Sequence, residues 1–339
     1  MKDLSGTKNL MAGAASASPT CPFTAAPLQP ARPLAMDWRR PSDPRQWTIW
    51  WTPDHRYGQI HPRPTPEEVG AFYEVETYYT HINRAEIRAE EEALRPGKLQ
   101  RVLGSIAYRF ENGAEPTSEW WRSVIPQGAR EGLEIGCGNG DRMLTIAPHV
   151  QRVIGVEPDP AATKLARANG LDVREGTAEA LPDAVLDRRY DAIVFAHVLE
   201  HTIDPVLALK NAGSLLTDTG VMSVEVPNNA CEGAKLMGDC WRWLDVPRHL
   251  NFFTPDSLRA CAEAAGLKVQ AVLYRGYVRQ FMPDWILDEA RIVATMEGRA
   301  VTQADVDRQV RHSARLLART AMAAPEKKYD SVRVLCTRN

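Results

Sequence analysis

The chain has 339 residues, with 41 Lys and Arg against 43 Asp and Glu, which gives a formal net charge of −2. This near balance argues against a general nucleic-acid-binding protein, because such proteins normally carry a large basic excess. The length allows two domains or one enlarged domain, and 44% apolar residues can form a core that needs no disulfide or metal to stabilise it. No apolar run reaches the length of a transmembrane helix, so no membrane partner is expected.

The six cysteines are scattered along the chain and include no CxxC pair. A zinc ribbon or an iron–sulfur cluster is therefore not expected, and no metal site is predicted. Residues 1–36 form a lead rich in Ala, Ser and Pro, whose apolar residues are interrupted in a way that a signal peptide is not. We expect this lead to be disordered and the protein to be cytoplasmic.

Residues 37–125 are predicted to form an aromatic and helical arm. Its first part, 37–64, contains four Trp residues, too many aromatics for a disordered segment, and favours an irregular packed arm or short strands. Thr65 followed by Pro66, Glu67 and Glu68 is typical of a helix start. The helices predicted in this arm run from 65 to about 79 and over 82–94, 99–110 and 118–124.

From Glu131 onward, short apolar runs alternate with helical stretches. This alternation is typical of βαβ units, in which a parallel sheet carries helices on both faces. Strands are predicted at 132–135, 152–156, 172–174, 190–195 and 221–226, with helices at 141–148, 160–169 and 204–216. After an aperiodic segment, the prediction continues with a helix at 254–265, a strand at 267–274, helices at 284–296 and 302–322, and a last strand at 331–336.

The clearest motif runs from Gly136 to Asp141 and reads Gly-Cys-Gly-Asn-Gly-Asp, between a predicted strand and a predicted helix. Glycine lets the backbone turn sharply and approach a ligand, and the helix start offers free N–H groups. A dinucleotide-binding loop has the spacing GxGxxG, whereas here the third glycine comes one residue early and an acidic residue follows it. An acidic residue repels a pyrophosphate but suits an ammonium and a sulfonium, which favours S-adenosylmethionine over NAD.

Three further strand ends extend this pattern. Glu157 ends the second strand, where a carboxylate can accept both ribose hydroxyls, as it also does in NAD proteins. The third strand leads into Thr177-Ala178, and the fourth ends at Ala196-His197. With these four strand ends in order, residues 131–226 resemble class I S-adenosylmethionine-dependent methyltransferases. The small-molecule branch, which includes ubiquinone-type O-methyltransferases and sugar C-methyltransferases, is most similar, also in the runs at 62–68 and 241–254.

The resemblance implies an α/β fold with a Rossmann-like, seven-stranded, mostly parallel sheet whose last strand is antiparallel. The S-adenosylmethionine-binding domain would span 126–339, with a helical insertion at 281–325 before the last strand, and the helical arm at 37–125 would cover the substrate site. The insertion can roof the pocket or form the face of a homodimer, and the sequence does not decide between the two. Some relatives carry a cysteine-ligated zinc module before such an arm, but the cysteines are missing here.

The resemblance also implies the cofactor contacts, with S-adenosylhomocysteine as the product. The implied cofactor-binding residues are Glu134 for the amino group, Gly136, Gly138 and Gly140 for the loop, Glu157 for the ribose, Thr177 and Ala178 for the adenine edge, and Ala196 and His197 beside the methionine moiety. Many relatives have Asp where Thr177 stands, so the adenine contact would come here from backbone or hydroxyl.

The acceptor is expected where the carboxyl ends of the strands meet the N-terminal helices and the loop at 228–253. Methyl transfer needs alignment and sometimes a base. His249 is the first candidate base because its unperturbed pKa lies near neutrality, with a structural capping role as the alternative. His197 is the second candidate. The predicted substrate-binding residues, which offer aromatic walls and cations for a small acceptor, are Trp241, Arg242, Arg248, His249, Tyr78 and Tyr79.

The expected reaction is methyl transfer to a small molecule, first of all to a hydroxyl, with C-, N- or S-methylation as alternatives. A nucleic-acid methyltransferase is disfavoured, because residues 196–199 lack the Asn/Asp-Pro-Pro-aromatic form expected for methylation of exocyclic base amines. Asp141 disfavours an NAD-linked oxidoreductase. A non-catalytic S-adenosylmethionine-binding protein remains a further alternative.

Overall fold

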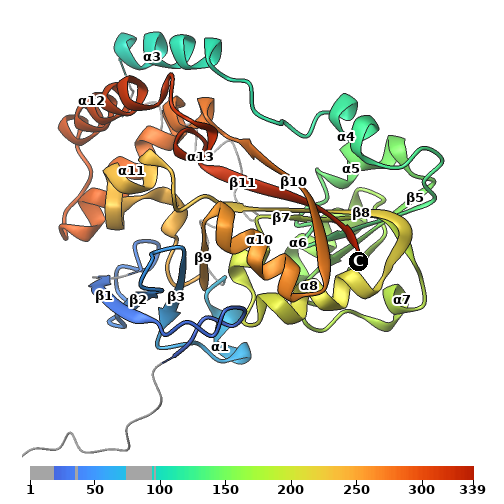
Figure 1. Cartoon of the computed structure of the whole chain (residues 1–339). Helices are drawn as coiled ribbons and strands as arrows, with labels where there is room; N and C mark the ends of the chain where they lie inside the picture. Colours follow the sequence, from blue (N-terminus) through green and yellow to red (C-terminus); the bar gives the residue numbers. More distant parts are fainter. Residues whose placement is uncertain (1–18, 35–36, 74–93, 95–96) are drawn as a thin grey trace, which may run out of the picture.

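The computed structural model describes residues 19–34, 37–73, 94 and 97–339 (Figure 1). The helix predicted at 82–94, except for its last residue, and the end of the helix predicted at 65–79 lie outside the described residues. The candidate residues Tyr78 and Tyr79 lie outside them too. Among the described helices, none combines the length and the apolar composition that a membrane crossing requires.

A seven-stranded sheet forms the centre of the molecule. Its strands are β4 (Glu131–Ile135), β5 (Arg152–Glu157), β6 (Val173–Glu175), β7 (Tyr190–Ala196), β8 (Leu216–Pro227), β10 (Leu267–Arg275) and β11 (Ser331–Arg338). They are ordered β10-β11-β8-β7-β4-β5-β6. The strands from β8 to β6 pair in parallel, whereas β11 is antiparallel to both of its neighbours. The predicted fold class is therefore confirmed, including the antiparallel last strand.

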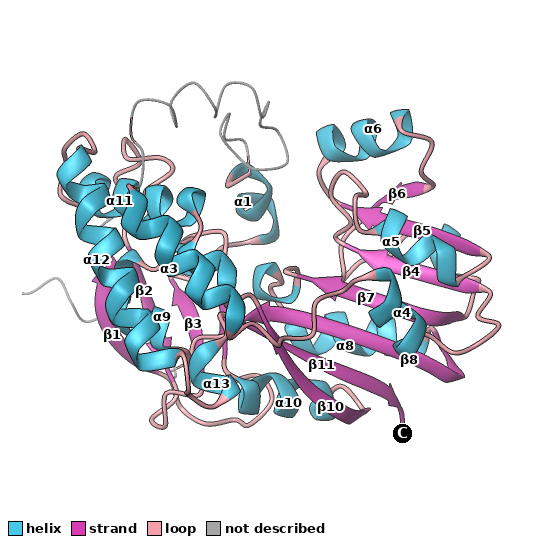
Figure 2. Ribbon diagram, turned by 90° about the horizontal axis from the view of Figure 1, so that it is seen from above, coloured by secondary structure: helices cyan, strands magenta, loops and turns pink. Residues whose placement is uncertain are grey.

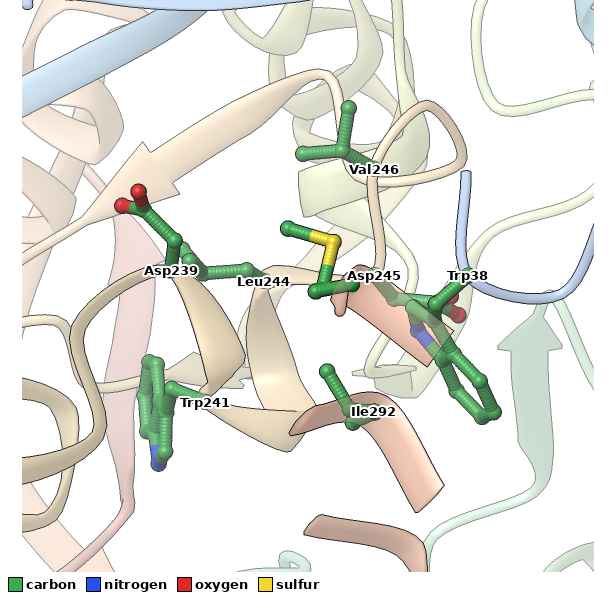
Figure 3. A pocket seen from close by; sticks show the side chains of 8 residues that line it. Trp38, Asp239, Trp241, Leu244, Asp245, Val246 and Ile292 are labelled. Atoms are coloured by element: carbon green, nitrogen blue, oxygen red, sulfur yellow. The ribbon is translucent and has the colours of Figure 1, made fainter. Parts of the chain in front are cut away.

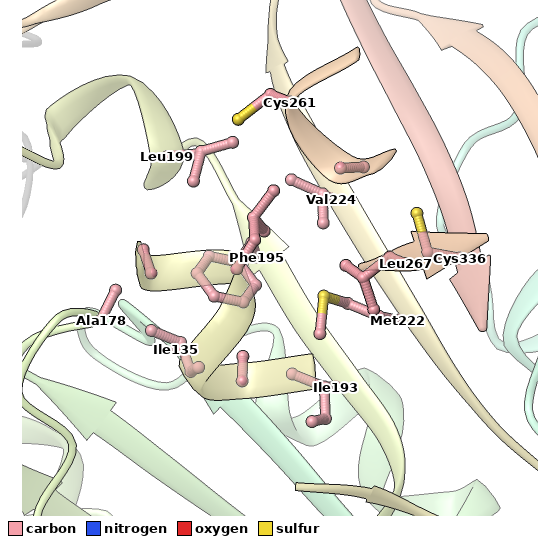
Figure 4. Close-up of a cluster of buried hydrophobic side chains, with 14 of the residues drawn as sticks. Ile135, Ala178, Ile193, Phe195, Leu199, Met222, Val224, Cys261, Leu267 and Cys336 are labelled. Atoms are coloured by element: carbon pink, nitrogen blue, oxygen red, sulfur yellow. The ribbon is translucent and has the colours of Figure 1, made fainter. Parts of the chain in front are cut away.

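Helices cover both faces of this sheet, because alternate residues of each strand point to opposite sides. The helices connected with the sheet are α4 (Ser118–Val124), α5 (Met143–Ile146), α6 (Pro160–Ala168), α7 (Asp183–Leu186), α8 (Pro205–Ser214) and α10 (Pro255–Ala264). In β7, Ala192 and Val194 pack in one apolar cluster with α4 and α5, whereas Ile193 and Phe195 pack in another with α8 and α10 (Figures 1 and 4). Both faces of the inner strands are thus buried, as a parallel sheet requires.

A second, four-stranded antiparallel sheet has the order β1-β2-β3-β9. Its strands are β1 (Gln29–Leu34), β2 (Trp47–Trp51), β3 (Tyr57–His61) and β9 (Asn251–Phe253). The prediction of a disordered lead is wrong for residues 19–34, since β1 pairs with β2, and Cys21 and Leu28 are buried. The short strands foreseen in the arm exist, but the sequence did not reveal their pairing with β9. Local sequence patterns cannot reveal this pairing, because β3 and β9 lie about 190 residues apart in the chain.

The helix α1 (Pro66–Ala71) begins at Thr65, whose side chain accepts from the Glu68 amide in a capping box, as predicted. Farther along, α3 (Lys98–Arg109) packs through Leu103 and Ala107 against the helices between β10 and β11 (Figures 1 and 2). Those helices are η5 (Val278–Phe281), α11 (Pro283–Met296), α12 (Gln303–Thr320) and α13 (Pro325–Lys328). The arm and the insertion therefore share one apolar core.

Candidate active site

The loops after β4 and β7 meet at the carboxyl edge of the sheet. These strands are neighbours, but the chain continues from them toward opposite ends of the sheet, and such a switch point is where open α/β sheets bind ligands. Gly136 has a φ of +68°, and a Cβ there would lie 2.3 Å from Cγ2 of Val198, just after β7. Only glycine accommodates both this backbone conformation and this close approach.

The glycine loop is held by the carboxylate at the end of β5. The Gly138 amide donates to Glu157 Oε2 at 2.8 Å, and the Asp159 amide donates to Glu157 Oε1 at 2.9 Å. Burial raises the pKa of Glu157, although these two amides oppose the shift. Gly140 also has a positive φ, and a Cβ there would lie 2.1 Å from Leu171 Cδ1. The structure thus brings together the three predicted glycines and Glu157.

Glu134, the central carboxylate of β4, has a buried oxygen without a partner. Its Oε1 lies 3.2 Å from Arg142 Nε, whereas its Oε2 has no hydrogen-bond partner. Burial raises the pKa of Glu134 to about 8, despite the nearby Arg142. A buried acceptor without a donor is costly, and the ammonium group of an amino-acid moiety would supply both the donor and the charge. The residues at this edge therefore fit S-adenosylmethionine.

The turn after β6 contains the two residues expected at the adenine edge. Thr177 is exposed, and its hydroxyl accepts from the Ala180 amide at 3.1 Å, while Ala178 is buried. The Thr177 hydroxyl therefore stabilises its own turn.

Strand β7 ends at the same edge of the sheet, on the other side of β4 and β5. Ala196 is its last residue, and the following His197 has a φ of +58°. A non-glycine residue in this left-handed region marks a locally constrained backbone.

Two buried carboxylates bind the imidazole ring of His197. Its Nε2 lies 3.0 Å from Glu225 Oε1, at the end of β8, and its Nδ1 lies 3.3 Å from Glu200 Oε1. Burial alone would lower the pKa of His197, but the hydrogen bonds with Glu200 and Glu225 raise it above its usual value. Both ring nitrogens of His197 are therefore engaged with carboxylates, which disfavours its predicted role as a catalytic base.

Glu225 in turn is bound by two arginines. Arg333 stands directly opposite it in the pairing of β8 with β11 and donates to its Oε2 at 2.6 Å, and Arg275 donates to its Oε1 at 2.9 Å. Burial would raise the pKa of Glu225, but the two arginines hold it well below its usual range. These three residues were not predicted as site residues. A charged residue within an otherwise apolar strand was the signal that could have revealed them.

Trp243 forms the wall opposite the end of β7. Its ring is stacked on His197 with the centroids 4.6 Å apart, and the guanidinium of Arg279 lies 5.0 Å above its centroid. The ring edge of Trp285 in α11 lies against it, with centroids 5.6 Å apart. The Trp243 indole N–H donates to Asp330 at 3.2 Å. The insertion therefore reaches the loop at 228–253 through aromatic contacts.

His249 is buried and lies beside His201, with the ring centroids 4.6 Å apart. Its Nδ1 lies 2.7 Å from the Trp243 carbonyl oxygen, which can only accept, so Nδ1 carries the proton. Burial and the nearby His201 lower the pKa of His249 to about 4. The near-neutral pKa on which its prediction as a base rested is therefore absent, and His249 is a weak base in this structure.

The predicted substrate-binding residues of the loop take other roles. Arg248 is fully buried and donates to Asp37 and Asp245, which corrects its assignment as a substrate-binding residue. Arg242 pairs with Asp284 and Asp288 of α11. Trp241 is buried and lines a pocket of about 10 Å³, enough for about one water molecule (Figure 3). This pocket is too small for an acceptor molecule.

The comparisons with known proteins agree with this architecture. Residues 93–272, more than half of the chain, match the family model described as a methyltransferase domain. The ubiquinone biosynthesis O-methyltransferase of Azorhizobium caulinodans is 32% identical over 189 residues, which cover 52% of this chain and 71% of that protein. Its counterpart from Cereibacter sphaeroides is 28% identical over 186 residues, covering 51% and 72%.

One of the solved structures similar to this chain is an S-adenosylmethionine-dependent methyltransferase from Thermotoga maritima, described as a possible histamine N-methyltransferase. It is 21% identical, with a TM-score of 0.42, and the match covers 70% of this chain and 92% of that chain. The glycine loop, the carboxylate at the end of β5 and the family match to residues 93–272 lead to one conclusion. The chain belongs to the methyltransferase domain family and is a class I S-adenosylmethionine-dependent methyltransferase.

Proposed function

We propose that this protein transfers the methyl group of S-adenosylmethionine to a hydroxyl group of a small molecule. The observation that carries the cofactor assignment is the unpartnered, buried Glu134 oxygen two residues before the Gly136 turn. The names of the two relatives, both ubiquinone biosynthesis O-methyltransferases, support oxygen as the acceptor atom. C-, N- and S-methylation are the alternatives within the same class.

The proposed cofactor contacts follow the carboxyl edge of the sheet. Glu134 would receive the ammonium group, and Glu157, which anchors the glycine loop through the Gly138 amide, has lone pairs left for the ribose hydroxyls. The buried Ala178 would lie at the edge of the adenine, with the remaining contacts there made by backbone because the Thr177 hydroxyl is engaged in its own turn. Ala196 and His197 would border the methionine moiety.

The acceptor would bind beside the stacked rings of His197 and Trp243. An aromatic surface next to buried charges suits a small, partly apolar molecule with a polar group to be oriented. The guanidinium of Arg242 already forms ion pairs with Asp284 and Asp288. Arg248 is fully buried. We therefore place recognition of the acceptor on Trp243 and its neighbours, in place of the predicted arginines.

The arm at 37–125 would cover this site, since several of its residues are fastened to the loops beside it. Arg63 donates to the carbonyl oxygens of Thr202 and Leu250. The Tyr73 hydroxyl lies 2.8 Å from His201 Nδ1, and Asp37 accepts from Arg248. These contacts connect the arm both to the segment after β7 and to the loop before β9. The arm thereby closes one side of the carboxyl edge.

When bound, S-adenosylmethionine supplies a sulfonium-activated methyl group for in-line displacement by the acceptor oxygen. The residues of the chain mainly position the reactants, because neither histidine of the site is a good base. Both ring nitrogens of His197 are engaged with Glu200 and Glu225, and His249 is neutral at pH 7. The expected contribution to the rate is alignment and exclusion of water.

The experiment that tests this proposal uses the purified full chain, S-adenosylmethionine with an isotopically labelled methyl group, and a metabolite extract. Mass spectrometry should find a compound that gains the labelled methyl mass only when the protein is present. Fragmentation of that product then identifies the methylated atom. Label on carbon, nitrogen or sulfur would replace the O-methylation proposal, and binding of the cofactor without any labelled product would favour a non-catalytic protein.

A further inference from the structure

Three side chains that can bind metal ions meet beside the proposed acceptor site. Each of Glu200, His201 and His249 offers one ligand atom, and these three atoms all lie within 4.8 Å of one another. Glu200 and His201 belong to the short helix η2 (Leu199–His201) directly after β7, whereas His249 precedes β9. Glu200 is fully buried and His249 is 3% exposed. Tertiary folding therefore brings residues 48 positions apart to one point.

Backbone carbonyl groups set the orientation of both imidazole rings. His249 Nδ1 lies 2.7 Å from the Trp243 carbonyl oxygen, and His201 Nδ1 lies 3.0 Å from the Arg248 carbonyl oxygen. A carbonyl oxygen can only accept, so His249 Nδ1 carries the hydrogen and its Nε2 keeps the lone pair. His201 Nδ1 lies against both the Arg248 carbonyl and the Tyr73 hydroxyl, and in the tautomer that donates to the carbonyl its Nε2 also keeps the lone pair. Metal-bound histidines typically donate their second N–H to such a carbonyl or carboxylate, which fixes the tautomer.

The carboxylate of the group has a free oxygen. Glu200 Oε1 lies 3.3 Å from His197 Nδ1, but Glu200 Oε2 is buried and has no hydrogen-bond partner. A fully buried carboxylate oxygen without a donor is unfavourable. This unpartnered oxygen and one nitrogen of each imidazole ring give the group three potential ligand atoms. A bound cation would satisfy this set.

We propose that Glu200, His201 and His249 bind a divalent transition-metal ion. Two imidazole nitrogens and one carboxylate oxygen suit zinc and its first-row neighbours, whereas Mg²⁺ and Ca²⁺ prefer oxygen ligands. Three protein ligands leave at least one coordination position open. The ion fastens the loop at 228–253 to the end of β7, because His249 lies on that loop and the other two ligands follow β7.

The open position also gives the ion a role in the reaction, and this part rests on the proposed function. A divalent ion lowers the pKa of a hydroxyl group bound to it. An acceptor hydroxyl at that position would release its proton to solvent near neutral pH. Its oxygen would then bond to the methyl carbon as the sulfur–methyl bond of the cofactor breaks, with S-adenosylhomocysteine as the leaving group.

The test measures metal binding directly, without cofactor or acceptor. The full chain is stripped with a chelator and titrated with Co²⁺, whose visible absorption reports coordination by nitrogen and oxygen ligands. One Co²⁺ per chain should bind, and Zn²⁺ should displace it. Absence of Co²⁺ binding, or displacement by millimolar Mg²⁺ but not by Zn²⁺, would overturn the proposal.

Two conservative variants identify the ligands. Glu200→Gln and His249→Gln should each weaken Co²⁺ binding by at least about tenfold. His149→Gln, at a histidine that is hydrogen-bonded to Ser118 and outside the group, should bind as the wild type does. Circular dichroism shows whether each variant is folded. If a variant does not fold, the Co²⁺ titration of the wild-type chain still tests whether the protein binds the metal ion. Wild-type affinity in both folded variants would refute the assigned ligands.

The two proposals fail in different ways. Metal binding without labelled product would leave the metal site standing and reject the methyl-transfer proposal. Labelled product from a metal-stripped protein, at the same rate as from the Zn²⁺-loaded protein, would reject the catalytic role of the ion alone.

Discussion

The indole ring of Trp243 lies nearly parallel to the imidazole ring of His197, with an angle of 11° between their planes and 4.6 Å between their centroids. One ring belongs to the loop before β9 and the other follows β7. Because two carboxylates contact the ring nitrogens of His197, its ring has a fixed orientation, and the stack adds aromatic packing to these contacts. It thereby sets the position of the loop relative to the glycine turn.

Removal of the indole should therefore affect the rate of methyl transfer. Trp243→Ala removes the ring that is stacked on His197. We expect kcat/KM to fall by up to about 100-fold, because small displacements of the reactants lower the rate by about this factor. Trp243→Phe keeps an aromatic face and should retain most of the activity. Steady-state kinetics with the acceptor identified by labelling provide the measurement. Equal activity in the Ala variant and the wild type would show that the stack does not position the reactants.

The glycine turn predicts a sharp contrast between two positions. Gly136→Ala should abolish measurable binding of S-adenosylmethionine, because the new Cβ would lie 2.3 Å from Cγ2 of Val198 at a φ of +68°. Gly128 has a similar φ of +79° but nothing within 4 Å of its Cβ position. Gly128→Ala should therefore cost only about 1–2 kcal/mol of stability and leave binding intact. Calorimetric titration of both variants tests the contrast, and equal loss in both would contradict it.

Glu134 predicts a pH dependence of cofactor binding. Its pKa of about 8 means that the free protein holds the carboxyl protonated below that pH. An ammonium group needs the carboxylate, so below pH 8 the affinity for S-adenosylmethionine should rise with pH by up to about tenfold per unit; at higher pH the ammonium group of the cofactor itself loses its proton, and the rise should end. Binding should release a proton, which is visible as a dependence of the measured heat on the buffer. In Glu134→Gln, both the pH dependence and the proton release should disappear.

The same carboxyl also affects stability, and the sign follows from its raised pKa. Between 4.5, the ordinary pKa of a Glu side chain, and about 8, the folded protein binds a proton that the unfolded chain has lost. The free energy of unfolding therefore decreases as the pH rises through this window. Glu134→Gln should gain stability relative to the wild type from pH 5 to pH 8 in urea unfolding. A wild-type advantage that grows with pH would contradict this sign.

Arg248 tests the distinction between a structural and a substrate-binding residue. It is fully buried, and it pairs with Asp37 and Asp245. Arg248→Ala should lower the free energy of unfolding by about 3–5 kcal/mol, because it leaves buried carboxylates without their cation. Arg45→Ala, which removes a half-exposed ion pair with Asp43, should cost no more than about 1 kcal/mol. Unchanged stability of the Arg248 variant with a raised KM would restore its role in substrate binding.

Local patterns in the sequence were sufficient for the core of the fold. The alternation of strands and helices from residue 131 onward, the glycines of the first turn and the carboxylate of Glu157 all act within a few residues of their own position. Hydrophobic periodicity and turn chemistry depend on neighbours along the chain, so they can be read from it. The seven strands are accordingly close to what the sequence predicted, whereas the contact of Gly138 with Glu157 became visible only in the structure.

Only the tertiary structure decided the side of the site that faces the acceptor. The sequence alone does not show that Arg248 would be buried between two carboxylates, that Glu225 would neutralise Arg333 across two strands, or that His249 would lose its basicity by burial. Each of these properties depends on desolvation and on charges contributed by segments far away in the chain. Because a side chain's pKa and its available hydrogen bonds are set by such surroundings, residue type alone could not assign their roles.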